Sequence, residues 1–384
     1  MKIIIFTSFF GSGYGLGYSA YKEAEEFSES GHDVTVVCIQ KKDDLGINKK
    51  IKIILLPKIR KPILEIIDYF FKLRKFSIEN NLNNYDVIYI QSLEFGLLNF
   101  SKIKVPVYYF SRSTIIGIVD CYRRYGIKLN FTKRLVNKIL IILEKMVLRH
   151  CQKVFVKSGL MARELSEFYD VENTKIDVIT GGIDKKDFND EFSEDQLDGL
   201  RKKYGIASGE KVFVYAGRIV PQKGLSYLIE ALEVLGDESD FRLLVAGSVV
   251  NLGYYSSILN LLNKNKLNDK VLFIGHIDQF EMNMVLGVAA GVISPSLYEP
   301  FGMINIQAAV LKKVIITTTA VGSNEILKGY EKMIVVNPGS AAELAEAIKS
   351  VKPLYDMKSE KDFYNYSWKK VSDKLLSIFQ KSLH

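Results

Sequence analysis

The sequence contains few of the residues that form disulfides or bind transition metals. Its 384 residues include only three cysteines and four histidines, namely Cys38, Cys121, Cys151, His32, His150, His276 and His384. An odd number of widely spaced cysteines excludes a disulfide framework and favours a reducing compartment. The spacing of these residues matches no zinc-binding pattern. We therefore expect a cytoplasmic protein that binds no metal and no other cofactor.

Long apolar runs and internal repeats are also lacking. No run approaches the roughly 18 apolar residues that a membrane-spanning helix needs, and no fixed period indicates a repeat architecture. Eight prolines and 48% hydrophobic residues exclude a largely disordered chain. The opening MKIIIFTSFF could be taken for a signal peptide, but a glycine-rich loop follows it, so we interpret it as a strand. The length suits two domains better than one.

The first half begins with a pattern typical of a βαβ unit. A strand at 2–7 is followed by Gly11, Gly13, Gly15 and Gly17, then by a helix at 18–29 and a strand at 31–38. Further strands are expected at 51–57, 86–91, 105–110, 154–157 and 175–180, with helices at 64–80 and 131–149. The glycines favour either of two interpretations, a tight strand-to-helix turn or a flexible binding loop in which Gly13 and Gly15 contact a ligand.

The second half predicts a second doubly wound parallel sheet. Strands are expected at 212–216, 242–246, 271–274, 291–294, 314–318 and 333–336, separated by helical segments. Ligands bind at the carboxyl ends of such strands. After the first strand come Gly217 and Arg218, and Lys223 precedes the next helix, so two cations beside a helix start predict a diphosphate site. His276 follows another strand end, where it is either a surface residue or a contact to a nucleotide base.

An acidic loop follows the fourth of these strands, in SPSLYEPFGMINIQAAVLKK. Pro295 and Pro300 interrupt regular structure, which leaves Glu299 in a loop. A helix is expected at 301–311 and a buried strand at 314–319. Because the first N–H groups of a helix are unpaired, Glu299 and the backbone of Phe301, Gly302, Met303 and Ile304 can face the same ligand.

The acidic loop resembles the signature of retaining nucleotide-sugar glycosyltransferases of family 4, which have the GT-B fold. In that family the first glutamate of the signature, here Glu299, faces the donor sugar, and a second acidic position, here Gln307, holds the nucleotide ribose. The segment YAGRIVPQKG resembles the family's donor-phosphate signature, with Arg218 and Lys223 matching. Many members carry a histidine after the strand that ends at Phe110, where this sequence has Ser111 to Ser113.

The resemblance implies two Rossmann-like domains facing a cleft. We place an acceptor-side domain at 1–181, a nucleotide-sugar domain at 182–365 and a helix returning to the first domain at 366–384, with Gly181-Gly182 as the joint. The implied reaction is metal-independent hexosyl transfer from a UDP- or GDP-sugar to a glycan or lipid-linked acceptor, with Glu299, Arg218 and Lys223 as catalytic residues. A catalytically inert relative that binds nucleotide or a partner, and a nucleotide-sugar epimerase, are the alternatives.

Positive charge is concentrated in one segment. The whole chain has a net charge of +8, yet residues 101–153 contain twelve Lys or Arg and only two acids. Within this segment Leu135, Ile139, Ile142 and Met146 lie on one stripe of the helix expected at 131–149. Three interpretations stay open, namely a packed helix with a solvated basic face, peripheral attachment to an anionic membrane, and nucleic-acid binding. The last is not expected, because the segment lacks regularly spaced aromatic residues.

Overall fold

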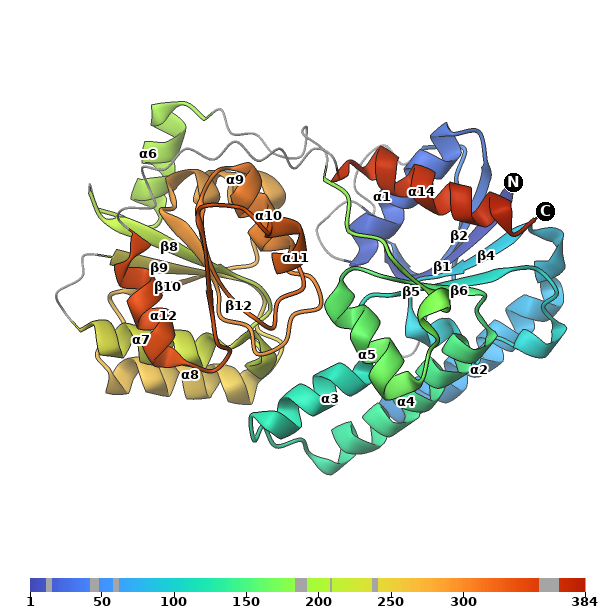
Figure 1. Cartoon of the computed structure of the whole chain (residues 1–384), viewed down its shortest axis with the longest axis horizontal. Helices are drawn as coiled ribbons and strands as arrows, with labels where there is room; N and C mark the ends of the chain where they lie inside the picture. The colour runs from blue at the N-terminus through green and yellow to red at the C-terminus, as the bar shows by residue number, and fades with distance from the viewer. Residues whose placement is uncertain are drawn as a thin grey trace. The chain divides into compact units, whose positions relative to one another are not determined.

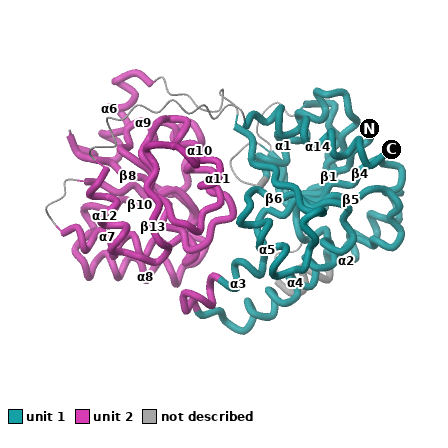
Figure 2. Tube along the Cα trace, viewed as in Figure 1, with its two compact units in different colours: residues 1–120, 128–183, 366–384 teal, residues 121–127, 184–365 magenta. Residues whose placement is uncertain are grey.

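The computed structural model describes residues 1–11, 16–41, 48–57, 62–183, 192–207, 209–236, 241–351 and 366–383. The chain divides into two compact units (Figure 2). Unit 1 comprises residues 1–120, 128–183 and 366–384, and unit 2 comprises residues 121–127 and 184–365. Each unit contains one parallel sheet with helices on its faces, so the predicted fold class of two doubly wound α/β domains is confirmed (Figure 1).

Unit 1 contains a seven-stranded sheet in the order β3-β2-β1-β4-β5-β6-β7. Its strands are β1 Lys2–Phe10, β2 Asp33–Lys41, β3 Lys52–Leu55, β4 Val87–Ile90, β5 Val107–Ser111, β6 Lys153–Val156 and β7 Ile176–Val178. The helices of the first half are α1 Leu16–Glu29, α2 Pro62–Glu79, α3 Ile115–Arg124, α4 Phe131–His150 and α5 Gly159–Tyr169, and α14 Trp368–Lys381 lies at the chain end.

The apolar run of β1 is buried on both faces of this sheet. Ile4 and Phe6 join a core with α2, α4 and α5, whereas Ile3 and Ile5 join a core with α1 and α14. Side chains of a strand alternate between faces, so a continuous apolar run is what a sheet covered on both sides requires. The opening residues, which could be mistaken for a signal peptide, are therefore an interior strand of the sheet of unit 1.

Unit 2 contains a six-stranded parallel sheet in the order β10-β9-β8-β11-β12-β13. Its strands are β8 Lys211–Ala216, β9 Phe241–Ala246, β10 Val271–Gly275, β11 Gly291–Ser294, β12 Val314–Thr318 and β13 Met333–Val336. Its helices are α6 Glu194–Lys203, α7 Leu225–Leu235, α8 Leu252–Lys264, α9 Gln279–Val288, α10 Met303–Val310, α11 Asn324–Leu327 and α12 Ala341–Lys349. The strand order reverses between β8 and β11, and ligands bind outside the carboxyl ends of strands at such a point.

The chain end belongs to unit 1. Helix α14 packs beside α1, and Phe379 contacts the rings of Phe27, Tyr89 and Tyr108. Gly182, which we interpreted as part of a joint, is buried against this segment, because a Cβ at that position would overlap the ring of Trp368. The close approach of Trp368 thus accounts for a glycine at position 182.

The apolar stripe noted in the sequence of α4 is not the face through which this helix packs. Leu135, Ile142 and Met146 are exposed, with Ile142 at 58%. The buried residues of α4 are instead Leu143, Glu144, Val147 and Leu148. Apolar residues occur on two sides of this helix. The core of unit 1 covers the side that carries Val147 and Leu148. An exposed apolar stripe flanked by basic residues is the result.

Candidate active site

Backbone hydrogen bonds connect three loops at the carboxyl edge of the sheet of unit 2. In the loop after β11, the N–H groups of Leu297 and Tyr298 donate to the carbonyl oxygen of Gln222, at 2.9 and 3.3 Å. The N–H of Glu299 donates to the carbonyl of Ala320, and the N–H of Gly322 donates back to the carbonyl of Glu299, both at 3.0 Å. Backbone bonds therefore hold the acidic loop between the loops that follow β8 and β12.

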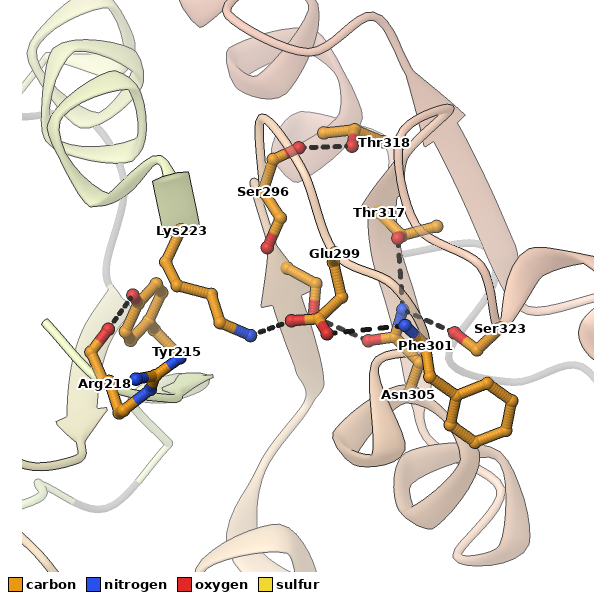
Figure 3. Close-up of polar contacts among 11 residues, drawn as sticks. Tyr215, Arg218, Lys223, Ser296, Glu299, Phe301, Asn305, Thr317, Thr318 and Ser323 are labelled. Atoms are coloured by element: carbon orange, nitrogen blue, oxygen red, sulfur yellow. Dashed lines mark hydrogen bonds and ion pairs between the residues drawn. The ribbon is translucent and has the colours of Figure 1, made fainter. Parts of the chain in front are cut away.

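This fastening brings Glu299 and Lys223 together. Their side chains form an ion pair (Figure 3) and are 14% and 20% exposed. The other carboxylate oxygen of Glu299 accepts a hydrogen bond from the N–H of Phe301 at 3.4 Å. The structure thus joins two residues that lie 76 positions apart in the sequence, which the sequence placed at two separate strand ends.

Glycines allow the loop after β8 to approach the acidic loop. A 3-10 turn, Pro221–Lys223, ends at Gly224, whose φ of 70° is in the left-handed region that favours glycine. A Cβ at Gly224 would overlap the carbonyl oxygen of Pro295. Gly217, with φ 156°, lies against the Lys223 side chain, where a Cβ would come within 3.6 Å of Cε. These two positions place Lys223 directly before α7.

Two cations stand at this edge. Arg218 follows β8 and is exposed, and its carbonyl accepts a hydrogen bond from the Tyr215 hydroxyl at 3.3 Å. Burial of Lys223, together with the neighbouring positive charge of Arg218, lowers the pKa of the Lys223 ammonium. An anion bound here would offset that cost, since a diphosphate presents several oxygens to a guanidinium fork and an ammonium.

The predicted helix at 301–311 is shorter than expected. Helix α10 begins at Met303 because Gly302 is left-handed, with φ 88°, and Phe301 is bonded elsewhere. The carbonyl oxygen of Phe301 accepts a hydrogen bond from the N–H of Ser323 at 2.6 Å. Met303 and Ile304 lie in the first turn as predicted, whereas the N–H of Phe301 is committed to Glu299.

A buried polar network under the loop was missed by the sequence analysis. Asn305 in α10 is fully buried and accepts from the Ser294 hydroxyl at 2.6 Å. Its amide donates to Thr317 at 3.1 Å and to Ser323 at 3.4 Å (Figure 3). Asn305 therefore connects β11, β12 and the next loop directly behind Glu299. An asparagine inside the stretch MINIQAAV, in which Gln307 is the one other polar residue, was the available signal.

The remaining candidates lie in different surroundings. Gln307 is buried on α10, at 3% exposed. His276 is exposed after β10, an edge strand that β9 and β8 separate from β11, so it is remote in the sheet from Glu299. Gly13 and Gly15 lie outside the described residues. Within the described ranges, no group of three or more His, Cys, Asp or Glu is arranged to hold a metal ion.

Two family models match the chain, one in each half. The model described as Glycosyltransferase Family 4 matches residues 14–187, and the model described as Glycosyl transferases group 1 matches residues 198–370. The second match contains the Arg218, Lys223 and Glu299 cluster, and the first contains most of unit 1.

Curated relatives match part of the chain. An uncharacterized glycosyltransferase of Methanocaldococcus jannaschii is 25% identical over 237 residues, 60% of either chain. The D-inositol 3-phosphate glycosyltransferase of Mycolicibacterium smegmatis is 22% identical over 246 residues, 62% of this chain and 55% of the relative. The matched part of this chain thus spans less than two thirds of the length of these relatives.

Solved structures match nearly the whole chain. Sucrose-phosphate synthase from Thermosynechococcus elongatus has a TM-score of 0.81 at 18% identity, covering 99% of both chains. Anabaena HepE in complex with UDP-glucose has a TM-score of 0.75 at 14% identity, covering 99% of this chain and 100% of the other. At such identities the likeness shows that the fold is shared.

Proposed function

The chain belongs to the glycosyltransferases of family 4 type with the GT-B fold, and on this basis we propose that it transfers a sugar from a nucleoside diphosphate sugar to an acceptor. The observation that carries this proposal is the meeting of Arg218, Lys223 and Glu299 at the carboxyl edge of β8 and β11. This edge is the point where strand order reverses and where doubly wound sheets bind nucleotides.

Each residue of this cluster has a part in the proposed reaction. The bond between the anomeric carbon and the diphosphate oxygen breaks, and the electron pair leaves with the diphosphate. Arg218 and Lys223 stabilise the negative charge that grows there, as preorganised cations do in a site with little water. When Lys223 turns to the diphosphate, the Glu299 carboxylate is released to accept hydrogen bonds from the sugar hydroxyls.

The finer chemistry is part of the same proposal. Retention of the anomeric configuration rests on the resemblance of the acidic loop to that of retaining enzymes. In that course a phosphate oxygen of the leaving group takes the proton of the acceptor hydroxyl as the new bond forms. Metal independence rests on the two cations, which supply the positive charge that a bound Mg²⁺ would otherwise provide. UDP and GDP sugars are the first donors to test.

A donor-turnover assay in the presence of EDTA tests this function. We expect the protein to release nucleoside diphosphate from one sugar donor. The sugar is transferred slowly to water and faster to the correct acceptor, and both rates are expected to be unchanged in EDTA. Loss of turnover in EDTA, restored by Mg²⁺, would contradict metal independence. Interconversion of the free donor without acceptor would identify an epimerase, and nucleotide binding without any turnover would identify an inert relative.

We further propose that the acceptor side of the protein attaches to an anionic membrane. The exposed residues Leu135, Ile142 and Met146 of α4 are accompanied by exposed Lys133, Arg134, Lys138, Lys145 and Arg149. On α2, which packs in the same core as α4, Phe71 and Ile78 are 62% and 74% exposed. Within the described ranges no helix is long and apolar enough to cross a membrane. Apolar and basic residues together on exposed helices are typical of attachment at a lipid surface.

Vesicle binding tests this surface. Replacing Lys133, Arg134 and Lys138 by Gln is expected to weaken binding to vesicles containing phosphatidylserine by about 3 kcal/mol, or roughly a hundredfold, at about 1 kcal/mol for each cation. The control replaces Lys2, Lys49 and Lys50 by Gln, which removes the same charge from exposed positions elsewhere in unit 1. Co-sedimentation measures both. Equal weakening by the two triple variants, or no binding by the parent, would refute this surface as the attachment site.

A further inference from the structure

A small cavity lies at the amino edge of the sheet of unit 2. Its volume is about 240 Å³, and the described residues that line it are Ala290, Leu311, Lys312, Lys313, Val314 and Lys332. Three of these residues are lysines, and none of them is acidic. Side chains of one charge around a concave surface raise the local concentration of ions of the opposite charge. The lining of this cavity therefore favours an anion.

The pairing of two strands brings two of the lysines to this edge. Lys313 directly precedes β12 and Lys332 directly precedes β13. These strands are parallel neighbours in which Ile315 pairs with Met333, and the N–H of Ile315 donates to the carbonyl oxygen of Lys332 at 2.8 Å. The register of the sheet thus fixes Lys332 beside the residues that open β12.

The end of α10 adds the third lysine. The N–H of Lys312 donates to the carbonyl of Ala309 at 3.0 Å, and the N–H of Lys313 donates to the carbonyl of Ala308 at 2.8 Å. These two bonds close the helix in the usual way and require a left-handed residue between them. Lys312 has this conformation, with φ 57°, and is exposed. Lys312 thus forms the exposed part of the cavity lining, directly before Lys313.

Helix α9 orients the ammonium group of Lys313. Its Nζ donates to the carbonyl oxygen of Gly287, in the last turn of α9, at 2.7 Å. Among the described residues this is the only hydrogen bond of the ammonium, and Lys313 forms no ion pair with them. Burial, together with the positive charges of Lys332 and Arg201, lowers the pKa of Lys313 to about 8. An ammonium has three N–H donors, so the bond to α9 leaves two that can contact a ligand.

A structural role explains one of the three lysines. A lysine beside the last carbonyl groups of a helix stabilises the end of that helix, which accounts for the bond between Lys313 and Gly287. This role does not require two further lysines in the same cavity lining. Like charges that share a cavity repel one another, whereas an anion bound there would be attracted to all three.

We infer that Lys312, Lys313 and Lys332 form a binding site for a phosphate group. Lysine binds phosphate oxygens as a compact point charge. The volume of about 240 Å³ is below the roughly 300–1,000 Å³ that is typical of ligand pockets, which favours a small anion over a whole nucleotide. The phosphate is either the free inorganic ion or an ester of a small metabolite.

This phosphate site is separate from the donor edge of unit 2. Lys313 and Lys332 precede their strands, whereas Arg218 and Glu299 follow theirs. Because the strands of this sheet are parallel, the two groups lie at opposite edges. The inference therefore does not depend on the proposed function, and a phosphate and a nucleotide can be bound at the same time.

Phosphorus NMR titration with inorganic phosphate and with glycerol phosphate tests the site. The full chain carries Arg218→Ala and Lys223→Ala in these titrations, which removes the cations of the donor edge. We expect binding to broaden the phosphate resonance, and Lys312→Gly to weaken this binding at least about tenfold. Glycine suits the left-handed conformation at position 312, so this variant is expected to have a Tm no lower than that of its parent.

Lys266→Gly is the matched control. Lys266 is an exposed lysine with φ 54° that follows α8, and its N–H donates to the carbonyl of Asn263 in the same kind of helix end. Lys266 is not among the residues that line the cavity, so its replacement removes the same charge from the same backbone conformation elsewhere in unit 2. Phosphate binding is expected to be unchanged in this variant.

Equal weakening by Lys312→Gly and Lys266→Gly, or no binding of either ligand, would overturn the inference. Binding of inorganic phosphate alone, lost in Lys312→Gly, identifies the free ion as the ligand. Tighter binding of glycerol phosphate, lost in the same variant, identifies a phosphate ester.

Discussion

Replacing Glu299 by Gln is expected to lower kcat for sugar transfer by about a hundredfold to a thousandfold, the cost of removing one preorganised electrostatic contact from an active site. The amide has the size of the carboxylate but carries no charge to hold the sugar hydroxyls. It also releases Lys223 from its ion pair. Binding of the free nucleoside diphosphate is therefore expected to be unchanged or tighter.

Transfer kinetics measure the loss of kcat, and nucleotide titration on the same preparations measures the affinity for the nucleoside diphosphate. Glu346→Gln is the control, because Glu346 is an exposed residue of α12 that pairs only with nearby Lys349 among the described residues. Glu299→Gln with full activity would exclude Glu299 from the reaction. Loss of nucleotide binding along with activity would indicate that the carboxylate maintains the loop rather than contacting the sugar.

The second large effect concerns the cations. Arg218→Ala and Lys223→Ala are each expected to weaken nucleoside diphosphate binding by about tenfold to a hundredfold, since a hydrogen bond to a charged group contributes roughly 1.5–3 kcal/mol. Arg218 is exposed, and its side chain makes no hydrogen bond or ion pair with the described part of the chain. Lys223→Ala also leaves the Glu299 carboxylate without its cation. Because the unpaired carboxylate repels the diphosphate, this variant is expected to lose more affinity than Arg218→Ala.

Lys211→Ala provides the control for both variants. Lys211 is the exposed first residue of β8, the same strand that leads to Arg218, and its replacement removes the same charge from the opposite end. Calorimetric titration measures all three. Affinities that fall equally in Lys211→Ala would show that net charge alone attracts the nucleotide, and unchanged affinity in Arg218→Ala would remove it from the site.

The strands of both sheets were predictable because burial on two faces demands continuous runs of β-branched and aromatic residues. KIIIF in β1 and VIITT in β12 are such runs. Most runs of this kind are separated from the following run by a segment long enough to form a helix. Polar residues at strand ends then led to the prediction of a ligand site. Arg218, Lys223 and Glu299 were selected as candidates in this way, and the structure brings Lys223 and Glu299 into contact.

What the sequence could not supply is how separate loops are fastened to one another. The bonds from Leu297 and Tyr298 to Gln222 use backbone atoms, which leave no pattern of side chains. Asn305 was overlooked because an asparagine within an apolar helix reads as a weak helix former until its three partners are seen. The packed face of α4 stayed open in the sequence for a related reason, since periodicity shows that an apolar stripe exists but not whether the core covers it.

The surroundings of Arg112 could not be predicted from the sequence either. Its position after β5 was noted in the sequence, but a serine-arginine-serine segment gives no sign that the guanidinium is 9% exposed or bonded to Glu23. Burial and pairing between distant segments are properties of the folded chain. They appear only when α1 covers the sheet and places its carboxylate beside Gln91.

A thermal-shift panel of UDP, GDP, ADP and their common sugar conjugates, run on the parent and on Arg218→Ala, tests most directly that unit 2 binds a nucleotide-sugar donor. A ligand present at about 100 times its dissociation constant stabilises the folded chain by roughly 2.7 kcal/mol. We predict that one nucleotide and its sugar conjugate raise the Tm of the parent clearly and that Arg218→Ala removes most of this rise. A panel in which no nucleotide shifts the parent would contradict the account.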